Sequence, residues 1–171
     1  MLVLELGANL DASLPLLQRY RPAAVWLFAP RTISNLVEWT QKTREVTENA
    51  TKIWVQVGGI EEAVNVCRAC KPHVLVVRGI DAGGHGLNHG AGVISVLPEV
   101  SDALYGLVKL GELAEMLILI AAGRIAEGRG VAATLALGAE GVVMGTRYLA
   151  SEEAEILHGY KNEVLRMVDG G

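Results

Sequence analysis

The sequence contains no cluster of lysine and arginine residues, no long apolar run and no recognisable leader. Its 171 residues carry a formal net charge of −4, so nucleic acid, which binds basic surfaces, is not an expected partner. The longest apolar run, residues 116–122, is far shorter than the roughly 20 residues that span a membrane. Glu5 follows the first apolar residues at once, without a basic region or cleavage site. We therefore expect a cytoplasmic protein that is not bound to a membrane.

Cysteine is also scarce. Cys67 and Cys70 are the only two, and they are spaced as CxxC. A redox or zinc site with this spacing needs a helix N-terminus or a second pair of ligands, whereas this pair lies late in an expected helix. We interpret the two cysteines as small residues that pack on a helix face in a reducing, intracellular setting.

Short apolar runs alternate with helical patterns, which is the order of the βα units that build a parallel sheet. The length and the composition, 51% hydrophobic and 20% charged, suit a single domain over residues 1–171. Six strands are predicted, at residues 3–6, 24–28, 53–57, 74–77, 117–121 and 142–144. A closed barrel needs eight strands and typically about 250 residues. The sequence predicts an α/β fold, either a parallel (β/α) TIM-barrel type with about six of its eight strands or an open sheet.

Helix boundaries are predicted from capping residues and apolar periodicity. The first helix is expected to begin near Asp11 or Ser13, and Ser34 is a candidate N-cap for the second. A loop and helical stretch is expected over residues 101–115. A later helix over residues 130–137 is expected to end on Gly138, because glycine adopts the left-handed backbone conformation that closes a helix.

Three segments that contain glycine follow the last three strands. They are residues 81–86 (DAGGHG), residues 122–130 (AGRIAEGRG) and residues 145–146 (GT). Barrel active sites are built where strands end, and glycine lets backbone N–H groups approach a phosphate. Glycine also serves in ordinary tight turns. Three such segments in series nevertheless favour a phosphate site.

His85 is the natural reactive group among the four histidines. It lies between glycines that give a ligand access, and imidazole titrates near neutral pH. The alternative is a histidine that only binds a backbone carbonyl to hold the loop. His89 lies in the same glycine-rich stretch and is the second candidate. His73 is expected on the surface, at the opposite end of the barrel.

The order of these motifs resembles the nitronate monooxygenase family, formerly called 2-nitropropane dioxygenases. The resemblance is carried by DAGGHG at residues 81–86, GAGVISVLPEVSDA at 90–103, IAAGRIAEGRG at 120–130 and LGAEGVVMGTRYL at 137–149. It runs from about Ala24 to the C-terminus. These enzymes bind FMN on a TIM barrel and oxidise alkyl nitronates with O2. The chain looks like roughly the C-terminal two-thirds of that barrel.

The resemblance also implies roles for particular residues. His85 would be the catalytic base that takes the α-proton of a nitroalkane. The FMN phosphate would be contacted by Gly123, Gly145 and Thr146. The full set of cofactor-binding residues expected from the resemblance is Gln56, Gly83, Gly84, Gly123, Arg124, Gly145 and Thr146. No metal ligands are expected.

Two arginines depart from the family pattern. The family usually has a second glycine where this chain has Arg124. If the backbone there has positive φ, arginine is strained; if not, its guanidinium could clamp the phosphate. Arg78 stands where the family commonly has Gln or Asp near the flavin, so its charge would alter the flavin's electronic properties. Two other functions stay open: a different FMN or phosphate-binding barrel oxidoreductase, such as a flavin-dependent enoyl reductase, and a truncated, catalytically impaired paralogue.

Overall fold

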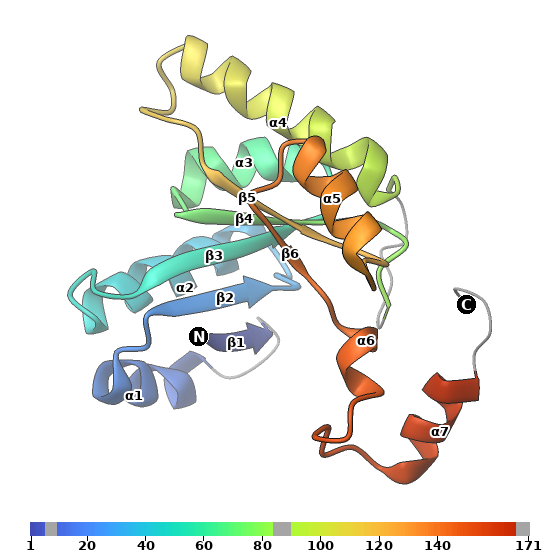
Figure 1. The fold of residues 1–171 in the computed structure, drawn as a ribbon. Helices are drawn as coiled ribbons and strands as arrows, with labels where there is room; N and C mark the ends of the chain where they lie inside the picture. The colour runs from blue at the N-terminus through green and yellow to red at the C-terminus, as the bar shows by residue number, and fades with distance from the viewer. Residues whose placement is uncertain (6–9, 84–89, 167–171) are drawn as a thin grey trace.

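The computed structural model describes residues 1–5, 10–83 and 90–166, and its centre is a curled, six-stranded parallel sheet (Figure 1). The strands are β1 (Leu2–Glu5), β2 (Ala24–Phe28), β3 (Lys52–Val57), β4 (Val74–Arg78), β5 (Ile118–Ala122) and β6 (Gly141–Val143). They pair in chain order, from β1 to β6. Every strand boundary falls within one residue of its prediction. The predicted incomplete (β/α) barrel is confirmed, with β1 and β6 at the two edges of the sheet.

A helix follows each strand, as the predicted βα order requires. The helices are α1 (Leu10–Tyr20), α2 (Ile33–Val46), α3 (Ile60–Cys70), α4 (Val93–Lys109), α5 (Gly128–Ala136), α6 (Thr146–Leu149) and α7 (His158–Arg166). Successive helices from α1 to α5 contact one another along the outer side of the sheet, while α6 and α7 extend away beyond the end of β6 (Figure 1). Within the described part of the chain, no helix is both long and apolar enough to cross a membrane.

The two faces of the sheet differ in burial. On the outer face, the residues in register across four strands are buried against the helices: Leu27, Val55, Leu75 and Leu119. On the inner face, Trp26 and Trp54 pair in register and are only partly buried, and Ile118 is 42% exposed. At β4, by contrast, the inner-face residues Val74 and Val76 are buried, so the inner face is enclosed there and more open at Trp26, Trp54 and Ile118.

Two helix predictions were wrong. Thr32, rather than Ser34, caps α2: its Oγ1 accepts a hydrogen bond of 3.1 Å from the backbone N–H of Asn35. Thr32 has the extended backbone that an N-cap requires, whereas Ser34 already lies in the first turn. The helix α4 begins at Val93, well before the stretch expected over residues 101–115. By contrast, Gly138 has a positive φ just after α5, as predicted.

Cys67 and Cys70 pack on the buried face of α3 together with Ala63 and Val66. Both cysteines are free and 1% exposed. Burial raises the pKa of the Cys67 thiol to about 11, which leaves very little of the reactive thiolate at neutral pH. The interpretation of this CxxC pair as packing residues is confirmed.

His73 lies just before β4, at the end of the sheet opposite the glycine segments. Its ring Nδ1 accepts a hydrogen bond of 3.0 Å from the N–H of Ile53, and its backbone N–H donates to the Ile53 carbonyl over 2.8 Å. The side chain is partly buried, so it is more enclosed than the surface position expected, and it lies at the expected end of the sheet. The pairing of β3 with β4 brings Ile53 close enough to hold the ring.

Candidate functional site

The three glycine segments meet at the C-terminal edge of the sheet. Arg78, Ala122 and Val143 end their strands in register. Beyond them, the N–H of Gly79 donates to the Ala122 carbonyl over 2.9 Å, which joins the first segment to the second. A Cβ added to Gly83 would lie 3.2 Å from Oγ1 of Thr146, so the first segment also touches the third. Parallel strands bring about this convergence because their C-terminal ends share one edge.

The side chain of Asp81 lies between the first two segments, and its Oδ1 is buried without a hydrogen-bond partner among the described residues. A Cβ added to Gly79 would lie 2.2 Å from its Oδ1, and one added to Gly123 would lie 2.7 Å away. Its second oxygen, Oδ2, faces Gly92, the residue that precedes α4. The Asp81 carboxylate leaves no room for a side chain at residue 123, and at residue 79 the backbone N of Val93, 2.4 Å from an added Cβ, excludes a side chain as well. The sequence interpretation missed Asp81, although the residue opens the DAGGHG motif.

Arg78 holds the same segment from the inner face of the sheet. It alternates along β4 with Val74 and Val76 and is 9% exposed. Its Nη2 donates to the Gly83 carbonyl over 3.1 Å and lies 3.4 Å from the Ala82 carbonyl. A buried arginine therefore orders the start of the loop that leads toward His85.

The remaining predicted residues differ in how open their surroundings are. A Cβ added to Gly145 would meet no described atom within 4 Å, and Thr146 is exposed. Gln56 is partly buried on the inner face, in register with Val76. Gly84, His85 and His89 fall outside the residues that the structure describes, so their roles stay predictions.

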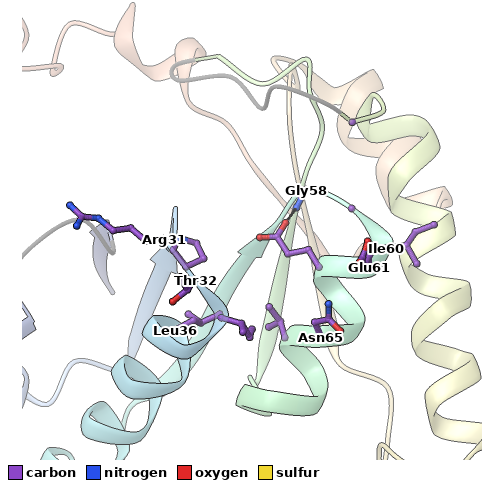
Figure 2. Close-up of a pocket in the computed structure, with 13 residues that line it drawn as sticks. Arg31, Thr32, Leu36, Gly58, Ile60, Glu61 and Asn65 are labelled. Carbon is purple, nitrogen blue, oxygen red and sulfur yellow. Dashed lines mark hydrogen bonds between the residues drawn. The ribbon is translucent and has the colours of Figure 1, made fainter.

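A separate groove of about 610 Å³ lies between the N-terminal ends of α2 and α3 (Figure 2). Thr32 and Leu36 stand on one side of it, and Glu61 and Asn65 on the other. The N–H of Gly58 is already bound by the Glu62 carboxylate over 2.7 Å. With acidic side chains at its mouth, this groove is a poor phosphate site. None of the predicted site residues that the structure describes lines it.

Comparison with known proteins agrees with this arrangement. The sequence model of nitronate monooxygenase matches residues 28–167. The chain belongs to the nitronate monooxygenase family. Nitronate monooxygenase npaC of Metarhizium robertsii is 47% identical over 167 residues, which cover 96% of this chain and 44% of that protein. The chain thus spans less than half of this relative, a smaller share than the two-thirds of a barrel expected from the sequence.

Solved structures show the same partial overlap. FabK from Thermotoga maritima superposes with a TM-score of 0.76 and 29% identity, over 96% of this chain and 47% of that one. Nitroalkane oxidase from Streptomyces ansochromogenes superposes with a TM-score of 0.68 and 26% identity, over 89% of this chain and 41% of that one. In each case this member of the nitronate monooxygenase family matches less than half of the longer chain.

The backbone at Arg124 bears on the interpretation of this departure from the family. Its φ is +49° and follows a φ of +137° at Gly123. The side chain is exposed. The backbone therefore has the left-handed conformation for which the family's usual glycine is suited, and arginine is strained there.

Proposed function

We propose that this chain forms the FMN phosphate-binding side of a nitronate monooxygenase that oxidises alkyl nitronates with O2. The observation that carries the proposal is the meeting of Gly83, Gly123 and Thr146 at one edge of the sheet. Exposed backbone at glycine, next to a hydroxyl donor, is a suitable environment for phosphate oxygens. Family membership supports the same assignment.

The residues present fit an FMN phosphate group at this edge. The space beside Gly145 is open to the described residues, and Thr146 Oγ1 faces Gly83. We assign the phosphate to Gly123, Gly145 and Thr146, and the ring to Gln56, Gly83 and Gly84. Arg124 stands beside the phosphate without clamping it. When bound, the flavin supplies the electron chemistry with the nitronate and O2.

His85 is assigned the one proton transfer that the protein performs. With a neutral nitroalkane, the His85 imidazole accepts the proton on the carbon next to the nitro group. A nitronate has already lost that proton and needs no base. Replacing His85 with Asn is therefore expected to slow nitroalkane turnover by about 10²–10⁴ and to leave nitronate oxidation largely intact. Equal loss of both activities at full FMN occupancy would instead make His85 a positioning residue.

The first experiment measures FMN binding to the purified chain by titration, followed by oxygen uptake with propyl-2-nitronate. Gly145→Glu is expected to abolish FMN binding through steric block and like-charge repulsion. Gly106→Glu is the matched control, because it adds the same charge toward the far end of α4, where a Cβ meets no described atom within 4 Å. FMN binding that survives Gly145→Glu would remove the phosphate assignment. FMN binding without nitronate turnover would favour a different FMN-binding barrel oxidoreductase.

A further inference from the structure

The arginine at the end of β4 is a buried cation on the wall of the proposed flavin site. Arg78 points to the inner face, since it alternates with Val74 and Val76, and it is 9% exposed. An arginine keeps its positive charge at any working pH. Its charge acts through a medium with little water, where electrostatic interactions are weakly screened.

This cation is attached to the segment that borders the site. Its Nη2 donates to the carbonyl of Gly83, and Gly83 in turn faces Thr146 from the third segment. Asp81, whose Oδ1 is buried without a hydrogen-bond partner among the described residues, lies in the same segment against Gly79 and Gly123. The guanidinium is held next to the residues that border the site by its hydrogen bonds to the Ala82 and Gly83 carbonyls.

We propose that Arg78 favours the negatively charged forms of a flavin bound at this edge, an effect that a neutral Gln at the same position would not provide. The inference rests on the proposed function, because it requires FMN at the three glycine segments. A fixed positive charge near a flavin ring stabilises the states in which the ring carries negative charge. Arg78 would act by tuning the flavin through space rather than by touching the substrate.

Sulfite is a probe for this effect that does not depend on turnover. Its sulfur lone pair forms a bond to N5 of oxidised flavin, and the ring's displaced electron pair becomes negative charge at N1 and the C2 carbonyl. The affinity for sulfite therefore reports how well the surroundings stabilise that charge. A titration of the FMN-loaded chain with sulfite, monitored by the loss of flavin absorbance, measures this affinity directly.

The test compares Arg78→Gln, which removes the charge, with Arg78→Lys, which keeps it. We expect Arg78→Gln to weaken sulfite binding about tenfold or more, the size of effect that one close, poorly screened charge produces, and Arg78→Lys to stay within about threefold of the parent. Arg68→Gln is the control, because that side chain is exposed and paired with Glu112, and it lies in the last turn of α3, outside the three glycine segments. It is expected to leave sulfite affinity unchanged.

Each other outcome overturns the inference. Sulfite affinity that is unchanged in Arg78→Gln, or reduced equally in Arg78→Lys, rules out an effect of the charge while the proposed function stands. A parent chain that binds no FMN overturns the proposed function, and this inference with it. If Arg78→Gln does not fold, the parent chain alone tests the proposal. The proposal then requires the FMN-loaded parent to bind sulfite more tightly than free FMN does. Equal or weaker binding by the parent rejects it.

Discussion

The carboxylate of Asp81 occupies the space that a side chain at residue 123 would need. A Cβ on Gly123 would lie 2.7 Å from Asp81 Oδ1, and the backbone φ there is +137°. The two residues are far apart in sequence and belong to segments that follow β4 and β5. This contact sets the spacing between the first two glycine segments.

We predict that Gly123→Ala destabilises the fold through both strain and overlap with Asp81. Overpacking typically costs about 1–3 kcal/mol, in addition to the cost of a Cβ at positive φ. In an Asp81→Ala background the overlap is absent, so Gly123→Ala should cost about 1–3 kcal/mol less there. Urea unfolding of the two single variants and the double variant measures this coupling.

Gly111→Ala provides the control for strain alone. Gly111 has a φ of +72°, and a Cβ there meets no described atom within 4 Å. Its effect on the free energy of unfolding should be the same in the parent chain and in the Asp81→Ala background, because a Cβ at residue 111 does not meet Asp81. If the effects of Gly123→Ala and Asp81→Ala simply add, the carboxylate is not what excludes a side chain at residue 123.

A second prediction concerns the strained arginine. The left-handed conformation costs a residue with a Cβ about 1–2 kcal/mol. Replacing arginine with glycine relieves this strain, but glycine also has more conformational freedom in the unfolded chain, which offsets part of the stabilisation. Arg124→Gly is therefore expected to raise the free energy of unfolding by up to about 1 kcal/mol. We propose that the side chain does not clamp the phosphate, so Arg124→Gly should leave FMN affinity unchanged or tighter. Arg124→Ala keeps the strain and should give no such gain.

Lys42→Gly is the comparison, because Lys42 is an exposed cation in the interior of the helix α2. Glycine in a helix interior costs about 1 kcal/mol, so Arg124→Gly and Lys42→Gly should shift the urea midpoint in opposite directions. A loss of stability in both variants would mean that the backbone at residue 124 is not strained by its side chain.

The sequence was a good guide to the strands and a poor guide to contacts between loops. Residues 53–57 located β3 because burial on the outer face demands apolar residues at alternate positions. Residues 74–77 located β4 because that strand is buried on both faces and is apolar throughout. The same alternation links Val74, Val76 and Arg78, so the inner-face position of Arg78 is also implicit in the sequence. Its hydrogen bond to Gly83 is not, because that contact depends on how the chain turns after β4.

Other features depend on backbone geometry that residue type does not specify. Thr32 and Ser34 are both able to cap a helix, and only the extended backbone at Thr32 selects it. The residue type at position 124 likewise does not predict the sign of its φ angle. The role of Asp81 depends on Gly123, a residue that only the pairing of β4 with β5 brings near. Contacts of this kind appear once the sheet is assembled.

The buried thiol of Cys67 predicts a loss of stability at alkaline pH. Its pKa is raised by burial from 9.0 to about 11, so between these values the unfolded chain loses a proton that the folded chain keeps. Stability is full below pH 9 and falls as the pH rises toward 11, by on the order of 2–3 kcal/mol. Cys67→Ala should be less stable at pH 7, because it leaves a cavity, but should lose less of its remaining stability up to pH 11. An alkaline slope equal to the parent's would contradict this assignment.

His73 predicts a pH dependence on the acidic side. Burial lowers its pKa below 6.5, and the charges of Lys52 and Arg44 act in the same direction. Protonation of Nδ1 would also break the hydrogen bond that the ring accepts from Ile53. The unfolded chain therefore takes up a proton first as the pH falls, so the contribution of His73 to stability is present above pH 6.5 and is lost below it. His73→Asn offers a neutral oxygen acceptor in place of Nδ1 and should flatten the decline in unfolding free energy between pH 7 and pH 5. Urea unfolding at several pH values measures both proteins, and a His73→Asn variant that declines as steeply as the parent would show that His73 does not cause the acid sensitivity.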